Sequence, residues 1–195
     1  MIKLCLGPLM AALSVSHNQH TLVSRREMVL KMNEFAVLGA IFNLSGKRPT
    51  YLGVQKTLES LALCPATKNC ISTSENVSDS VHYIPPWNYN GSREMPVKQE
   101  EAFQELLKVV KSTKVDNSTL RIIEQKEDYL LVEYETPILG LVDDVEFWFP
   151  SKGSSIVEYR SASRAGVFDF DANRKRIKTL RLELEKLGWS TQAAF

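Results

Sequence analysis

The sequence predicts an α+β domain in which two amphipathic helices pack on one face of an antiparallel sheet of three to five strands. Two observations favour this fold class. Successive segments between residues 119 and 164 are short, and several alternate apolar and polar side chains with the period of a half-covered strand. The segments that flank them, after Pro96 and before Gly188, repeat apolar residues at helical spacing.

Composition restricts the class of protein further. The chain has 195 residues, of which 44% are apolar and 24% are charged, as is typical of one soluble globular domain with a leader. A net charge of +1 and the lack of a basic stretch interleaved with aromatics argue against a nucleic-acid partner. The longest apolar run, residues 35–42, is about half of what a membrane span needs, so we expect no transmembrane segment.

Residues 1–54 are predicted to form a targeting leader. No acidic residue precedes Glu27, while serine, threonine and basic residues are present, which is the composition of an organelle transit peptide. The first fifteen residues also resemble a secretory signal peptide, with Lys3 at the basic end. Composition alone leaves both interpretations open.

The stretch Ser24–Val29, SRREMV, resembles a twin-arginine export signal, and the apolar run FAVLGAIF follows it. This layout predicts a chloroplast protein of the thylakoid lumen or one associated with thylakoids. Lys31, Glu34 and the lack of an Ala-x-Ala cleavage site depart from the pattern. The alternative is a stromal protein in which the arginine pair occurs by chance.

Residues 55–95 are predicted to form an extended arm that contains a cysteine pair. Cys64 and Cys70 are six residues apart around a proline, which is not the spacing of a zinc knuckle or a dithiol catalyst. The pair predicts either a disulfide, in an oxidising compartment, or two reduced thiols.

His82 and the aromatic residues of the arm have structural and functional interpretations. His82 is the single histidine beyond the leader, so it either supports a loop or carries any histidine-based acid–base chemistry. Pro85 and Pro86 disfavour a regular element. Trp87 and Tyr89 are expected to anchor the arm on the domain, and an exposed partner site is the alternative.

The folded domain is predicted to span residues 96–189, with a tail at 190–195. A first helix begins at Pro96 and extends through Lys111, with acidic residues in its first turn. A last helix is capped by Asp169 or Asp171 and stops at Gly188. The strands between them are predicted at Thr119–Glu124, Asp128–Glu135, Val142–Phe149 and Ile156–Arg164.

The hairpin of the last two strands concentrates charged residues. Asp143 shares a face with the apolar residues Val145, Phe147 and Phe149, and this face is expected to meet the helices. Three interpretations remain for the other charges. They form a salt-bridge ladder on a solvated face, or an anion site, or an acidic patch for a divalent metal or acid–base work. The anion-site candidates are Arg160, Ser161, Ser163, Arg164, Asn173 and Arg174, assisted by Arg176, and the acidic patch comprises Asp143, Asp144 and Glu146.

Several separated motifs resemble a family of plant and bacterial proteins catalogued as domain of unknown function 1499. These motifs are CPATKNCISTSE, HYIPPWNY, DDVEFWFP and RSASRAGVFDFDANRKRI, and the resemblance runs from about residue 61 to 189. It implies no assigned activity, and it implies a chloroplast location for plant members. It also implies counterparts in bacterial relatives for Cys64, Cys70, Asp143, Asp144, Arg160, Ser161, Ser163, Arg164, Asn173 and Arg174.

The function expected from these observations is that of a non-enzymatic accessory, assembly or interaction protein associated with thylakoids. No nucleotide-binding or serine-hydrolase signature occurs, and no cofactor or metal is predicted. The expected partner is a thylakoid or stromal protein complex, with peripheral membrane association also compatible. The alternative is a small-anion-binding or enzymatic domain that uses Arg160, Arg164 and Arg174.

Overall fold

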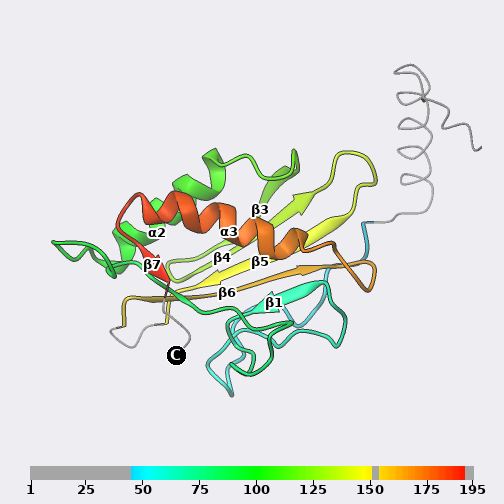
Figure 1. Cartoon of the computed structure of the whole chain (residues 1–195), viewed down its shortest axis with the longest axis horizontal. Helices are drawn as coiled ribbons and strands as arrows, with labels where there is room; N and C mark the ends of the chain where they lie inside the picture. The colour runs from blue at the N-terminus through cyan, green and yellow to red at the C-terminus, as the bar shows by residue number, and fades with distance from the viewer. Residues whose placement is uncertain (1–44, 151–153, 192–195) are drawn as a thin grey trace, which may run out of the picture.

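The computed structural model describes residues 45–150 and 154–191. As predicted, two helices accompany an antiparallel sheet in an α+β arrangement (Figure 1). The elements in chain order are β1 (Cys70–Ser72), β2 (Trp87–Asn88), α2 (Gln99–Ser112), β3 (Thr119–Gln125), β4 (Tyr129–Glu135), β5 (Val142–Trp148), β6 (Ile156–Ser163), α3 (Ala172–Glu185) and β7 (Ser190–Thr191).

The sheet has seven strands, so the predicted number of three to five is wrong. Its order is β3-β4-β5-β6-β2-β7, and β1 also pairs with β6. All the paired strands run antiparallel. The strands that the sequence did not predict are β1, β2 and β7, which have two or three residues each. Such strands are too short to show a periodic pattern, and β2 follows directly after two prolines.

Both helices lie along one face of the sheet, as predicted (Figure 1). Their apolar stripes pack against Val145 and Phe147 of β5 and against Phe149, which directly follows this strand. All three residues are fully buried. Burial of large apolar side chains is the main stabilising contribution in such a layered domain.

The arm is anchored on this core through Trp87. Its ring lies 4.3 Å from Tyr159 and 5.8 Å from Phe147, measured between ring centroids. Trp189 contacts the same tryptophan from the C-terminal side, at 6.3 Å. Trp87 and Tyr89 are therefore structural anchors, and the alternative of an exposed aromatic partner site at these residues is wrong.

The opposite face of the sheet is also covered, although the sequence predicted a solvated face. Leu61 is buried against Tyr129, Leu131 and Trp148, and two side chains that precede it, Leu52 and Val54, pack on the same cluster. Residues 45–54, which were assigned to the leader, therefore lie against the folded domain. Residues 1–44, with the predicted transit and twin-arginine segments, lie outside the described residues.

Within residues 45–150 and 154–191, no helix is long and apolar enough to cross a membrane.

Candidate functional site

The charged residues of the β5–β6 hairpin are buried rather than solvated. The exposed fraction is 0% for Glu146, 1% for Arg160 and 2% for Glu133, which lies on the neighbouring strand β4. The strand register places Glu146 directly opposite Arg160. The predicted ladder of ion pairs thus exists, but it lies inside the protein, where breaking a pair costs far more than at a surface.

Arg164 is the centre of one buried charge network. Its Nε donates to Asp144 Oδ2 at 2.8 Å, and its Nη2 also contacts Glu133. Glu133 accepts further hydrogen bonds from Arg48 Nε, at 2.9 Å, and from Arg121 Nε, at 3.2 Å. Burial by itself raises the pKa of Glu133, but hydrogen bonds from these three arginines outweigh it and lower that pKa to about 2.

Glu146 lies in a separate group, covered by residues 45–54, which we call the N-terminal segment. Its Oε1 accepts hydrogen bonds from the backbone N–H of Gly53, at 2.7 Å, and from the Tyr129 hydroxyl, at 2.8 Å. Arg160 Nη1 lies 3.5 Å from the other carboxylate oxygen, and the Tyr51 ring lies 5.4 Å from the Arg160 guanidinium. Burial dominates these contacts and raises the pKa of Glu146. Gly53 and Tyr51 belong to the segment that the sequence assigned to the leader.

A second polar group lies on the helix side of the sheet. Asn173 of α3 accepts a hydrogen bond from the Ser161 hydroxyl, and its amide donates to Ser163 Oγ at 2.9 Å. Arg176 Nη1 donates to the same Asn173 oxygen, and Nη2 forms an ion pair with Asp143 at 2.5 Å. This group joins α3 to β5 and β6 in the buried interior.

The predicted anion site is therefore divided by the sheet. Arg160 and Arg164 lie on the face that the N-terminal segment covers, while Ser161, Ser163 and Asn173 lie on the helix face. The backbone N–H groups at the start of α3 are also engaged, because Asp169 accepts hydrogen bonds from those of Asp171 and Asn173. Arg174, another of the predicted anion-binding residues, lines a pocket.

The acidic patch is divided in the same way. Asp143 pairs with Arg176 on the helix side, whereas Asp144 and Glu146 face the N-terminal segment. In the part of the chain that the structure describes, no group of three or more histidine, cysteine or acidic residues is placed to hold a metal ion. Two carboxylates on opposite faces of a strand cannot share a metal or a proton.

Cys64 and Cys70 form the disulfide that was one of the two predicted alternatives. The residues that it encloses are held on both sides. Lys68 N–H donates to Val167 O at 2.9 Å, and Thr67 O contacts His82 Nε2 at 3.2 Å. A hydrogen bond with Asp79 raises the pKa of His82. These contacts give His82 a structural role.

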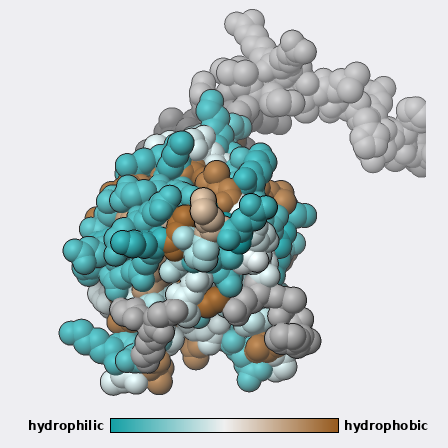
Figure 2. All heavy atoms as spheres, turned by 90° about the vertical axis from the view of Figure 1, so that its left-hand side faces the viewer, coloured by the Kyte–Doolittle hydropathy of each residue, from teal (hydrophilic) through white to brown (hydrophobic). Residues whose placement is uncertain are grey.

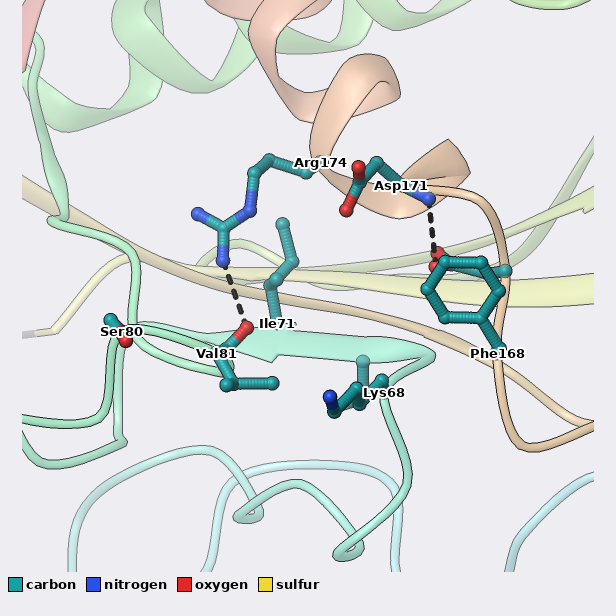
Figure 3. A pocket seen from close by; sticks show the side chains of 9 residues that line it. Lys68, Ile71, Ser80, Val81, Phe168, Asp171 and Arg174 are labelled. Atoms are coloured by element: carbon teal, nitrogen blue, oxygen red, sulfur yellow. Dashed lines mark hydrogen bonds between the residues drawn. The ribbon is translucent and has the colours of Figure 1, made fainter.

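A pocket of about 220 Å³ lies between β1, the start of α3 and residues 80–81 (Figure 3). Arg174 reaches into it from α3 and donates to Val81 O at 2.9 Å, while Lys68 lies across from it toward Phe168. Among the described residues, neither cation forms an ion pair with a carboxylate. The lining comprises Lys68, Cys70, Ile71, Ser80, Val81, Phe168, Asp169, Asp171 and Arg174.

Beside this pocket, three large apolar side chains project into solvent from the loop that joins β6 to α3. The exposed fraction is 71% for Val167, 50% for Phe168 and 77% for Phe170, and we call these three residues the apolar tip. The Phe168 and Phe170 rings pack edge to face with their centroids 4.9 Å apart. Sequence reasoning missed this feature, although GVFDF was available as a signal: apolar residues in a loop, where neither strand nor helix periodicity accounts for them.

The backbone of this loop is strained. Phe170 and Asp171 have φ values of 54° and 62°, in the left-handed region that residues other than glycine rarely adopt. Asp169 holds the turn through the Asp171 N–H, at 3.1 Å, and Lys175 Nζ donates to Phe170 O at 2.9 Å. Strained backbone that its surroundings maintain occurs often at functional sites.

Comparison with known proteins gives one match. The model of a family described as "Protein of unknown function (DUF1499)" matches residues 60–184, which is well over half of the chain. No significant match was found among curated proteins or among solved structures.

Proposed function

This chain belongs to the family of proteins of unknown function DUF1499, and we propose that it is a non-catalytic accessory protein that docks through the apolar tip. Its location, on this proposal, is the plastid, in the thylakoid lumen or at thylakoids. The composition of residues 1–54 and the Ser24–Val29 stretch support the location.

The observation that carries the docking role is the contrast between the two sets of candidate residues. The charged side chains of the hairpin bind one another and are buried, so their hydrogen-bonding capacity serves the fold. The apolar tip, by contrast, is exposed: Val167, Phe168 and Phe170 present apolar surface to solvent within four residues of one loop. Concentrated exposed apolar surface is typical of an interaction site, whereas scattered exposed apolar residues are normal.

A test in plastids compares tagged wild-type protein with the double variant Phe168→Ser/Phe170→Ser. Both side chains are at least half exposed, so the variant is expected to fold. The wild type should fractionate with membranes or with a larger complex, and the variant should be released as free protein. Met95→Ser is a matched control, because Met95 is 81% exposed and lies elsewhere, before α2. Equal fractionation of all three proteins would contradict the docking proposal.

The location is tested separately by replacing Arg25 and Arg26 with lysines. Twin-arginine export does not accept this change, so the proposed lumenal route predicts a precursor that accumulates in the stroma. Unchanged thylakoid processing would contradict the lumenal route and would favour the stromal alternative.

A second candidate function is binding of a small anion in the pocket beside Arg174. Lys68 and Arg174 are the observation that favours it, because both cations border the pocket without a carboxylate partner among the described residues. Thermal melts with phosphate and sugar phosphates test it. A stabilisation that disappears in Arg174→Ala would support this function, and flat melts would reject it.

A further inference from the structure

We propose that the apolar tip and the pocket beside it form a peripheral membrane-binding site, in which the tip enters the lipid surface and the pocket receives an anionic headgroup. This inference rests on the proposed docking function and names the partner as a bilayer that contains anionic lipid.

The shape of the tip favours a lipid surface over a peptide. A peptide site is a groove that receives side chains, whereas here Val167 and Phe170 project outward and about three quarters of each side chain is in solvent. The two phenylalanine rings support one another edge to face, so they present one apolar projection. Aromatic and aliphatic side chains of this kind partition into the boundary between headgroups and acyl chains.

The charge around the tip is suited to anionic lipid. Lys68, Arg174 and Lys175 lie on either side of it, and none of them forms an ion pair among the described residues. Two carboxylates also line the pocket, those of Asp169 and Asp171. Asp169 is engaged by the backbone N–H groups at the start of α3, whereas Asp171 is exposed and opposes the basic charge. Basic residues near an anionic bilayer each strengthen binding, and the pocket offers Lys68 and Arg174 to one phosphate.

The end of the molecule opposite the tip presents a different surface. Figure 1 shows the β6–α3 loop at the end of the molecule where β6 finishes. Figure 2 shows the opposite end, which is mostly hydrophilic with separate hydrophobic spots. With the apolar tip inserted, the molecule would approach a bilayer with the start of α3 toward the lipid.

The test measures co-sedimentation of the full chain with protein-free vesicles of phosphatidylcholine, with and without phosphatidylglycerol. Phe170→Ser should weaken binding to the mixed vesicles about tenfold, because burial of one phenylalanine changes an affinity by roughly that factor. The matched control Met95→Ser replaces an equally exposed apolar residue outside the tip and should bind as the wild type does. Since every variant carries residues 1–44, the differences report on the tip.

The charge contribution is measured with Lys68→Glu. Binding to the vesicles that contain phosphatidylglycerol should fall about fivefold or more, because each basic residue near an anionic surface contributes roughly that factor. Lys111→Glu makes the same change at an exposed position of α2 and should have little effect. Vesicle binding that is equal for wild type, Phe170→Ser and Lys68→Glu would overturn the inference.

Three further outcomes separate this inference from the proposed function. Tip-dependent binding to native membranes without binding to vesicles would overturn the lipid partner and keep docking, now to a membrane protein. If the protein binds native membranes and vesicles, and Phe170→Ser weakens neither interaction, both proposals would be overturned. Stabilisation by glycerol phosphate without vesicle binding would overturn the lipid partner and leave a soluble anion site at the pocket.

Discussion

Arg164 is the residue on which most of the buried charge on the N-terminal side of the sheet depends. It binds two carboxylates, those of Asp144 and Glu133, and both lie in the interior. The hydrogen bonds that it donates to Asp144 and Glu133 raise the pKa of its guanidinium, so it stays charged at every pH where the protein folds. A buried charge that loses its partner is strongly destabilising, even where the intact pair contributes little.

Arg164→Met is therefore expected to lower the free energy of unfolding by about 3–5 kcal/mol, because Asp144 loses its arginine in the interior. Urea unfolding, followed by tryptophan fluorescence, measures this change. Arg121→Met is the control, since Arg121 also binds Glu133 but is half exposed, and its loss should cost about 1 kcal/mol or less. Similar losses for both variants would contradict the assigned burial of the network.

Glu133 should make stability depend on pH in acid. Its folded pKa of about 2 lies below the ordinary value of 4.5, so its contribution is complete above pH 4.5 and is lost as the pH falls toward 2. The shift corresponds to roughly 3 kcal/mol. Unfolding free energies between pH 7 and pH 2 should therefore fall less steeply in Glu133→Gln than in the wild type. Parallel curves for the two proteins would argue against ionised, arginine-bound Glu133.

Phe170 is expected to contribute little to stability, because its backbone is strained and its side chain is exposed. Its left-handed φ of 54° costs a residue with a side chain about 1 kcal/mol or more, and glycine adopts this conformation without that cost. Phe170→Gly should leave the melting temperature unchanged or slightly raised, because the lost side chain is 77% exposed. Scanning calorimetry tests this expectation, and a clear fall in melting temperature would show that the side chain supports the fold.

At the scale of elements, strand and helix patterns predicted the main architecture well. The strands from β3 to β6 and both helices lie within about three residues of the positions that periodicity indicated. Local pattern predicts these elements because each has seven or more residues and an apolar face. The two-residue strand β2 forms where the arm pairs with β6, and β7 forms where Ser190–Thr191 pairs with β2. A contact between distant segments leaves no local pattern.

The Cys64–Cys70 disulfide holds a loop that borders the pocket. Replacing both cysteines with serine should lower the unfolding free energy by about 2 kcal/mol, which is the chain-entropy estimate for so short a loop. Thermal melts of the wild type with and without dithiothreitol should show a matching difference. The double variant is its own control, because the reductant should leave its melt unchanged, and hydrogen exchange should increase around Lys68 and Val167.

For the whole molecule, the sequence could not reveal that both faces of the sheet are covered. Alternating acidic and basic residues on β5 and β6 are also what a solvated face requires, so burial could not be distinguished from exposure. The covering segment, residues 45–61, has no regular element, and the hydrogen-bond partners of Arg48 and Tyr51 on the sheet lie 85 and 109 residues away along the chain. The division of the candidate anion site is missed for the same reason, since it depends on which face each element covers.

This covering predicts where a processed protein begins. Removal of residues through 54 would leave Glu146 without the Gly53 N–H and Arg160 without the Tyr51 ring, and it would expose Leu131 and Trp148. A chain that starts at residue 55 should be several kcal/mol less stable than one that starts at residue 45. Mass spectrometry of the protein from its natural source should find the N-terminus before Arg48. An N-terminus at about residue 55 would contradict this.

The covering segment also sets the order in which the molecule can be completed during synthesis. It leaves the ribosome, or enters a translocation channel, before any strand of the sheet to which it binds. Arg48 must wait for Glu133, and Tyr51 must wait for Arg160. The ion pairs and hydrogen bonds between this segment and the sheet consequently cannot form until the later strands have been synthesised, and their sequence separation makes them costly in loop-closure entropy. A chain halted before residue 164 already carries Arg48, Glu133 and Asp144 but lacks Arg164, which binds both carboxylates in the complete fold.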